Sequence, residues 1–193
     1  MNYPGHELLD FVHVVDDALP LPLCADLITT FDHAQGQPRH SVFEGVRDFH
    51  DLLINSDDAY RLMMPTVWGH FMGLVQGYLS NLQIPPQQID LSKCGAEGFR
   101  IKYYQQGVGQ FLKHVDVGDH QSARRALAVF WYLNDVDEGG ETVFYNQQGD
   151  VIRTIKPKAG RAVLFPPMWM FPHAGLIPVS SGKYLLSGYL HYQ

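Results

Sequence analysis

Residues 111–116 read Phe-Leu-Lys-His-Val-Asp, which is the pattern of the end of a β-strand. Because successive side chains of a strand point to opposite faces, His114 and Asp116 are expected to point the same way. One imidazole and one carboxylate are two thirds of a 2-His-1-carboxylate set, which suits non-haem Fe(II) and leaves coordination positions open. The tripeptide alone is weak support, because it also occurs at solvated strand ends.

The sequence after Ile89 consists of short apolar segments, rich in Val, Phe, Tyr and Trp, that are separated by Gly and Pro turns. Many short strands of this kind predict a sandwich or barrel. We expect strands at residues 89–94, 98–104, 110–116, 125–134, 141–145, 150–155, 162–165, 175–179 and 184–192.

The first half of the chain is expected to carry helices. Residues 8–15 read as a short strand, and apolar side chains at helical spacing predict a helix that begins at Pro22 and is ended by Gly36 and Pro38. Residues 39–56 mix Arg, His and Asp and are interpreted as mostly loop. A second helix is predicted from 56 to 82, which Pro65 would kink. The fold class is therefore mainly β with N-terminal helices.

Size and composition indicate one globular domain. The chain has 193 residues, of which 46% are hydrophobic and 18% charged. We expect a single domain over residues 1–193, with 1–88 forming a strand and supporting helices and 89–193 forming the β core with the site. The net charge of −6 gives no basic field for nucleic acid, which argues against that partner.

The expected location is the cytoplasm. Cys24 and Cys94 are too few for a disulfide framework and have no C-x-x-C spacing. The first residues lack a basic region followed by an apolar core, and no apolar run is long enough to span a membrane. Oligomeric state is left open between monomer and homodimer.

His173 is the candidate third ligand, because a returning strand can bring it back to His114 and Asp116. His120, four residues after Asp116, is the alternative. We favour His173, since ligands at 114, 116 and 120 would all lie on one loop and leave the barrel without a purpose.

Lys183 is ten residues after His173, and residues 178–182 between them predict a turn. The two residues are therefore expected on neighbouring antiparallel strands, with Lys183 paired near Ile177 and about 13 Å from His173. Two inward side chains could then bracket a dicarboxylate, because a lysine inside a barrel needs an anion. A lysine that merely begins a strand at the solvent edge is the alternative.

Residues 104–116, 132–144, 156–161 and 165–166 carry a family resemblance, as do His173, Pro178-Val179, Gly182 and Lys183. Together they resemble the iron- and 2-oxoglutarate-dependent dioxygenases, specifically the prolyl 4-hydroxylase branch. Order and spacing hold across residues 98–193, about half of the chain. The resemblance implies a double-stranded β-helix, a jelly-roll core of the cupin type.

The resemblance also implies roles. His114, Asp116 and His173 would bind Fe(II), and Lys183 would pair with the distal carboxylate of 2-oxoglutarate. Tyr104 sits where the family places a tyrosine that hydrogen-bonds this cosubstrate. O₂ would be the second cosubstrate, with ascorbate as a candidate reductant.

Two of the implied positions leave alternatives open. Trp131 falls at a variable pocket position, although it could equally be a core tryptophan. If Tyr104 faces inward, the period of two also turns Lys102 and Arg100 inward, where cations need partners. Either the strand is bulged, or Tyr103 is the inward residue, or a basic residue contacts substrate.

The chain departs from the branch in two places. Tyr189 stands where a tryptophan is usual, and the Arg-x-Ser anchor of other branches is absent at residues 183–185. The apolar segment 166–172, before the third ligand, is expected to wall the substrate mouth, with plain packing as the alternative.

The expected activity couples decarboxylation of 2-oxoglutarate, to succinate and CO₂, with hydroxylation of a C–H bond. A prolyl or other peptidyl residue is the favoured substrate, and a peptide or protein the expected partner. A free amino acid or small metabolite is the first alternative. A non-catalytic barrel that binds metal or ligand is the second, and a nucleic-acid demethylase a distant third.

Overall fold

The computed structural model describes residues 7–34, 39–43 and 46–193. The N-terminal elements are η1 (Leu8–Phe11), β1 (His13–Val15), α1 (Leu21–Asp32), β2 (Arg39–Phe43), β3 (Arg47–Leu53), η2 (Asp58–Tyr60) and α2 (Met64–Asn81). They are followed by η3 (Leu91–Lys93), β4 (Cys94–Ala96), β5 (Arg100–Tyr104), β6 (Gln110–His114), β7 (Arg125–Tyr132), β8 (Thr142–Tyr145), β9 (Val151–Ile155), β10 (Ala162–Phe165), β11 (His173–Gly175) and β12 (Lys183–Tyr192).

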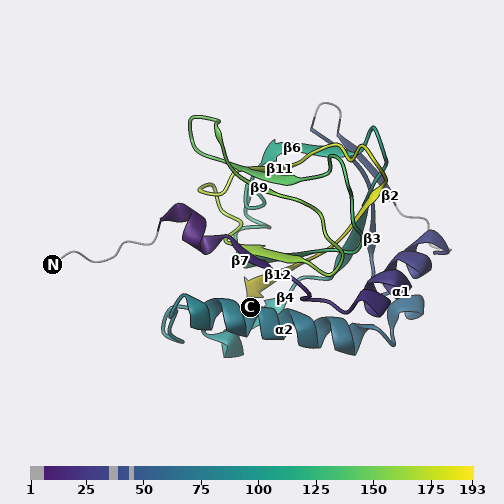
Figure 1. The fold of residues 1–193 in the computed structure, drawn as a ribbon. Helices are drawn as coiled ribbons and strands as arrows, with labels where there is room; N and C mark the ends of the chain where they lie inside the picture. Colours follow the sequence, from purple (N-terminus) through teal and green to yellow (C-terminus); the bar gives the residue numbers. More distant parts are fainter. Residues whose placement is uncertain (1–6, 35–38, 44–45) are drawn as a thin grey trace.

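The strands curl into two facing layers with the long helices on one side. In Figure 1, β7, β12 and β4 lie next to α2, whereas β6, β11 and β9 lie on the far side. The hydrogen-bonded order is β1-β10-β7-β12-β5-β3-β6-β11-β8-β9. Strand β3 joins the layers, because residues 50–53 pair with β5 and residues 47–48 pair with β6. The mainly β jelly-roll architecture with N-terminal helices is confirmed.

Alternate side chains of the same strands fill two separate cores. The outer core, between the sheet and the helices, contains Leu27, Phe31, Phe71, Val75, Phe99, Ile101, Leu127, Val129, Trp131 and Leu186. The inner core, inside the barrel, contains Phe49, Tyr104, Ala128, Phe130, Tyr132, Phe144, Phe165 and Leu185. The side-chain period of two is the reason why one strand such as β7 serves both.

The structure corrects the interpretation of residues 39–56 as loop. These residues form the antiparallel pair β2–β3, and β3 lies inside the barrel sheet. Most of their side chains are polar, and Phe49 is the fully buried apolar residue of β3. A strand whose polar side chains dominate gives little hydrophobic alternation, so its pairing follows from the neighbouring strands rather than from its own pattern.

The second helix begins later than predicted. Asp57 caps a separate turn, η2, by accepting a hydrogen bond from the Ala59 main-chain N (3.0 Å). Helix α2 starts at Met64, so Pro65 occupies the first turn, where its missing N–H costs nothing, and it does not kink the helix. The strand expected at 89–94 is instead η3 followed by β4, and the strand expected at 175–179 is β11, which ends at Gly175.

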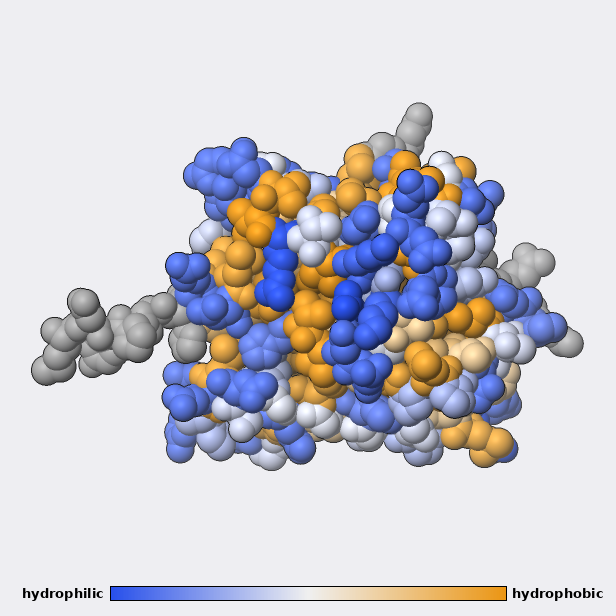
Figure 2. All heavy atoms as spheres, in the orientation of Figure 1, coloured by the Kyte–Doolittle hydropathy of each residue, from blue (hydrophilic) through white to orange (hydrophobic). Residues whose placement is uncertain are grey.

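The surface is mixed in polarity. Figure 2 shows apolar groups gathered along the middle of one face, between columns of hydrophilic side chains. No helix in the described part of the chain combines the length and the hydropathy that a bilayer crossing needs.

Candidate metal centre and adjoining groove

Three side chains converge inside the barrel. His114 ends β6 and His173 begins β11, and the two residues are directly paired across these antiparallel strands. Asp116 follows β6, with Oδ1 3.6 Å from His114 Nε2 and Oδ2 3.6 Å from His173 Nε2. One potential ligand atom from each residue lies within 4.8 Å of the others. Among the described residues this is the one such cluster, and His120 does not belong to it.

Main-chain carbonyls fix both imidazole rings. His114 Nδ1 lies 2.7 Å from Leu112 O, and His173 Nδ1 lies 3.0 Å from Phe171 O. A carbonyl oxygen can only accept, so each Nδ1 carries the proton and donates it. Each Nε2 therefore keeps its lone pair, directed toward Asp116, which is the orientation that a metal-binding histidine needs.

The charges of the cluster fit a divalent cation. Burial lowers the pKa of His173 to about 4, so its ring is neutral near pH 7. Burial alone would raise the pKa of Asp116, but the neighbouring histidines hold it well below its usual range. The buried Oδ2 atom of Asp116 has no hydrogen-bond partner among the described residues. Two imidazole nitrogens and an unsatisfied carboxylate oxygen form a donor set that could hold Fe(II).

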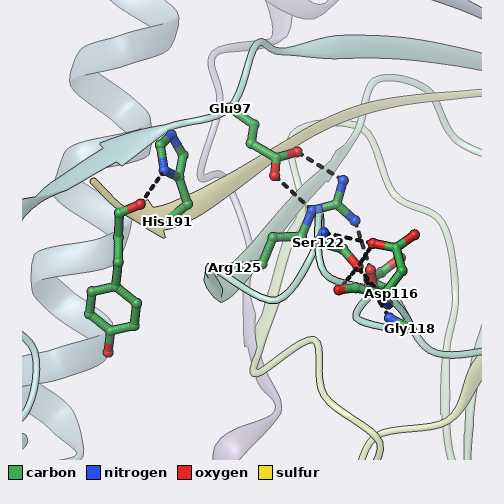
Figure 3. Close-up of polar contacts among 8 residues, drawn as sticks. Glu97, Asp116, Gly118, Ser122, Arg125 and His191 are labelled. Atoms are coloured by element: carbon green, nitrogen blue, oxygen red, sulfur yellow. Dashed lines mark hydrogen bonds and ion pairs between the residues drawn. The ribbon is translucent and has the colours of Figure 1, made fainter.

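Arg125 braces the main chain at Asp116. Figure 3 shows its guanidinium between Glu97 and the loop that carries Asp116. Nε and Nη2 donate to the two Glu97 carboxylate oxygens (2.9 Å each), and Nη1 donates to the Asp116 carbonyl (2.8 Å). The guanidinium also lies 4.1 Å from the centre of the Tyr189 ring. Bidentate pairing fixes the guanidinium plane, which in turn fixes the backbone next to the candidate ligand.

Lys183 faces the same interior from β12. Its Nζ donates to the Gly140 carbonyl (2.8 Å) and lies 4.2 Å from the centre of the Tyr104 ring. The residue is 1% exposed, and burial lowers its pKa to about 7 although Glu141 opposes the shift. The solvent-edge alternative is therefore wrong, because this lysine lies at the barrel interior.

The strand pairing expected for Lys183 is also wrong. Lys183 pairs with Tyr104 of β5, while β11 pairs with β6 and β8. The turn after Pro178 is a crossing between layers, in which the main-chain N–H groups of Val179 and Ser180 donate to Glu138 O. Lys183 and the residues of β11 nevertheless meet across the barrel, because a side chain on Gly175 would come within 3.4 Å of Lys183 Nζ.

A narrow inner cavity of about 20 Å³ links Lys183 to the candidate metal ligands. Phe130 and Thr142, which the sequence interpretation missed, also line it. Thr142 accepts a 2.6 Å hydrogen bond from the Tyr132 hydroxyl. Its place in the resembling segment 132–144 could have marked it.

Trp131 does not lie at this cavity, which corrects its expected role in cosubstrate binding. It is fully buried in the outer core, 6.4 Å from Phe71 between ring centres. In β7 the neighbouring residue Phe130 faces the cavity instead. A continuous apolar run has no polar residue to mark which side chains face inward, so the phase of β7 could not be read from it.

Tyr104 is the inward tyrosine of β5. It lies in the inner core, whereas Tyr103 packs on Tyr184 with ring centres 4.6 Å apart. The pairs of β5 with β12 and β3 run without a register shift, so the strand is not bulged. Lys102 therefore points inward beside Tyr104, with its Nζ 5.4 Å from the centre of the Phe49 ring.

Two larger cavities form a groove outside the candidate metal centre. The first, of about 430 Å³, is lined by His114 and Asp116, and the second, of about 740 Å³, extends past Asp116 to His191. They share Glu97 and Arg125 as walls. The groove is therefore continuous along one side of the site.

The apolar segment 166–172 approaches this region at one point. The Val117 main-chain N donates to Pro167 O (3.0 Å), which ties the segment to the residues after Asp116. Phe171 is buried, and Trp169 is 68% exposed. Packing thus accounts for Phe171, while the exposed Trp169 remains a predicted contact for substrate.

The chain is similar in sequence to one protein family and in fold to several solved structures. Residues 99–191 match the sequence model described as the 2OG-Fe(II) oxygenase superfamily. No curated protein sequence matches the chain. Among solved structures, a prolyl-4-hydroxylase from Pseudomonas putida superposes with a TM-score of 0.67 at 19% identity, covering 95% of this chain and 93% of that one.

Two further structures are similar. A viral collagen prolyl hydroxylase from Paramecium Bursaria Chlorella virus-1 has a TM-score of 0.66 at 19% identity, with 95% and 96% of the chains covered. A Trichoplax adhaerens prolyl hydroxylase in complex with a hypoxia inducible factor peptide has a TM-score of 0.71 at 15% identity, with 95% and 84% covered. At these identities the likeness concerns the fold. The matched segment, residues 99–191, belongs to the 2OG-Fe(II) oxygenase superfamily and spans the strands that carry the His-Asp-His cluster, so the chain is a 2-oxoglutarate-dependent non-haem iron dioxygenase with a prolyl hydroxylase-like fold.

Proposed function

We propose that His114, Asp116 and His173 hold Fe(II) and that the enzyme hydroxylates a residue within a peptide or protein. The observation that carries the metal assignment is the buried Asp116 Oδ2, which finds no hydrogen-bond partner in the described ranges and faces the Nε2 atom of His173 at 3.6 Å. When bound, iron and 2-oxoglutarate supply the oxidising chemistry, and the protein supplies position and a dry site.

In this proposal Lys183 takes the distal carboxylate of 2-oxoglutarate, with Tyr104 beside it. Lys183 is buried and has one neutral hydrogen-bond acceptor, the Gly140 carbonyl, so a carboxylate would be the stronger partner. The Lys183 ammonium gives one of its three donors to Gly140, so two remain for the carboxylate. Phe130 and Leu185 line the cavity with apolar surface that excludes water.

A peptide is the favoured substrate because the outer groove is long. Its two cavities of about 430 and 740 Å³ adjoin along Glu97 and Arg125, and the groove passes Asp116. A small closed mouth would fit a free amino acid better than this continuous groove does. The Trichoplax enzyme, whose fold is shared, was solved with a peptide bound.

The metal assignment is tested by anaerobic titration with Fe(II) and then 2-oxoglutarate, followed by the weak visible charge-transfer band of the chelate. We expect the band in the wild type and in His120→Ala, and its loss in His114→Ala. His120→Ala is the matched control, because His120 is exposed and lies outside the cluster. A folded, iron-loaded wild type without the band would contradict the proposal.

The substrate class is tested with pooled peptides and, in parallel, with free amino acids. Succinate release and a mass gain of one oxygen on the substrate are measured with and without ascorbate. Hydroxylation of peptides supports the proposal, whereas activity confined to free amino acids would replace it with the small-metabolite alternative.

A further inference from the structure

Lys102 is an inward cation with no role in the proposed cosubstrate site. It shares the inner face of β5 with Tyr104, and its partners across the sheet are Leu185 and Asp51. Its Nζ lies 5.4 Å and 6.0 Å from the ring centres of Phe49 and Phe130. Loss of hydration lowers the pKa of Lys102, and the charges of Asp116 and Asp51 oppose this shift.

The ammonium of Lys102 makes no hydrogen bond and no ion pair within the residues that the structure describes. The two acids whose charges act on Lys102 are already engaged. Asp51 forms an ion pair with Arg100, and Asp116 faces the two histidines. Lys183, by contrast, has the Gly140 carbonyl as its acceptor. Lys102 is half-buried and its ammonium lies over two aromatic rings, so it keeps only part of its hydration, and a carboxylate that reaches it would form a charge-assisted hydrogen bond.

The position of Lys102 indicates from which side the anion arrives. Lys102 lines both the inner cavity and the 430 Å³ outer cavity, together with Phe111, His114 and Asp116. Lys183 lines the inner cavity and is not part of the outer wall. Lys102 therefore stands at the opening between cosubstrate and groove, next to the candidate metal ligands.

Of the other cations that line the outer cavity, Arg125 and Arg100 are engaged by acids, and Arg47 is exposed to solvent, where a contact with a carboxylate contributes little. Arg125 donates to Glu97 and to the Asp116 carbonyl, so nitrogen atoms on both sides of its guanidinium are already engaged. Arg100 is bound by Asp51. The negative charge of Asp116 partly stabilises the Lys102 ammonium. A metal cation bound to Asp116 would cancel that charge and leave Lys102 without it.

We infer that Lys102 is a specificity-determining residue that binds a carboxylate of the substrate, supplied by an Asp or Glu side chain next to the residue that is hydroxylated. The inference rests on the proposed function and deepens it, because it names the chemistry of the peptide. The distal carboxylate of 2-oxoglutarate is assigned to Lys183, and only Lys102 of the two lysines lines the groove through which the peptide approaches.

The test compares two pools of capped peptides with a fixed central proline. One pool carries Asp and Glu at the neighbouring positions, and the other carries Asn and Gln. Equilibrium binding is measured by fluorescence polarisation without O₂, with Fe(II) and 2-oxoglutarate present, and hydroxylation is then measured in air. The variants are Lys102→Met, which keeps the apolar stem, and Lys102→Arg, which keeps the charge.

We expect the wild type to bind the acidic pool roughly 10- to 100-fold more tightly, the range for a hydrogen bond to a charged group. Lys102→Met should abolish this preference, and Lys102→Arg should retain part of it. The Asn and Gln pool is also tested without its C-terminal cap, so that each peptide carries a terminal carboxylate. This arm distinguishes binding of a terminal carboxylate from binding of a side-chain carboxylate. If only the uncapped peptides gain affinity, the side-chain assignment is wrong.

Three results would overturn the inference. One is equal binding of both pools by the wild type, and another is binding of neither pool. The third is a Lys102→Met variant that loses 2-oxoglutarate affinity while keeping its preference for acidic peptides. Failure of the proposed function is recognised separately, because the wild type would then lack the charge-transfer band before any peptide is added.

Discussion

The outer and inner cores are built by the same strands but differ in chemistry. The outer core consists of apolar and aromatic side chains between the sheet and α1 and α2. The inner face holds aromatic residues together with His173, Asp116 and two lysines. Moving one residue along β7, from Trp131 to Phe130, passes from one core to the other.

The difference teaches that stability and chemistry are assigned to opposite faces of one sheet. Burial of titratable groups costs free energy, and the inner face contains Lys183 and the candidate metal ligands. The outer face can offset this cost through close apolar packing, since burying one large side chain contributes about 1.5–3 kcal/mol. Substitutions on the two faces should therefore have separable effects.

The largest effect is expected from Asp116→Asn, which keeps the shape but removes the charge. Turnover, measured as succinate release, should fall on the order of 10³-fold, because metal chemistry contributes several kcal/mol. The free energy of unfolding of the metal-free protein should hold or rise, since an ionised carboxylate no longer has to be buried. Retention of wild-type turnover would break the assignment of Asp116.

The opposite result is expected from Phe71→Ala on the outer face. Phe71 is fully buried, with ring centres 5.3 Å from Phe99 and 6.4 Å from Trp131. Urea unfolding should show a loss of about 3–5 kcal/mol, the usual cost of deleting a buried phenylalanine. The folded fraction should bind Fe(II) and 2-oxoglutarate as the wild type does. A changed cosubstrate affinity would show that the two faces are coupled.

Lys183→Met should weaken 2-oxoglutarate without destabilising the fold. Loss of one partner of a buried charge pair costs about 2–5 kcal/mol of binding, so the Kd should rise at least about 30-fold. The unfolding midpoint should not fall, because a buried ammonium is replaced by an apolar side chain of similar length. Isothermal titration and urea unfolding measure the two quantities, and an unchanged Kd would remove Lys183 from the cosubstrate site.

The pH dependence of binding should follow Lys183. Burial lowers the pKa of Lys183 in the folded protein to about 7, below its usual 10.5, so the free enzyme loses this proton as pH rises through 7. A carboxylate favours the charged form, so binding takes up a proton and the Kd rises up to about tenfold per pH unit above 7. Titrations in buffers of different ionisation enthalpy detect the uptake, and Lys183→Met should lack it.

The lowered pKa of Lys183 also makes the free energy of unfolding depend on pH. Between pH 7 and 10.5 the unfolded chain holds the Lys183 proton and the folded chain does not, so this residue makes stability rise with pH across that window. The difference between wild type and Lys183→Met in urea unfolding isolates the contribution.

The smallest effect is expected from Trp131→Phe. Trp131 is fully buried in the outer core, and its indole Nε1 has no hydrogen-bond partner among the described residues. Its replacement should leave the 2-oxoglutarate Kd within about twofold and change the free energy of unfolding by about 1 kcal/mol. A larger change in Kd would restore Trp131 to the cosubstrate site.

The sequence predicted those features that rest on local pattern and on spacing. The short strands after residue 98 lie close to their expected positions, except the strand expected at 175–179, and His114, Asp116 and His173 meet as predicted. The inward direction of Tyr104 and of Lys102 follows from the strand period of two, once a bulge in β5 is excluded.

Features that depend on distant partners could not be predicted. Strand β3 is recognisable through its pairing with β5 and β6, not through its own polar sequence. Residues 178–182 have the composition of a hairpin turn. The main-chain N–H groups of Val179 and Ser180 instead donate to the Glu138 carbonyl, and the chain crosses to the other layer. The residue types of a turn predict that the chain changes direction, whereas tertiary contacts decide with which strand it then pairs.

The place of β12 in the sheet has a consequence for how the enzyme is made. This strand, residues 183–192, lies between β7 and β5, and β1 pairs with β10 across more than half of the chain. Contacts this distant in sequence make folding slow, and the sheet cannot close until residue 192 has left the ribosome. Until then the neighbouring edges of β7 and β5 are unpaired, and unpaired strand edges are prone to wrong pairing.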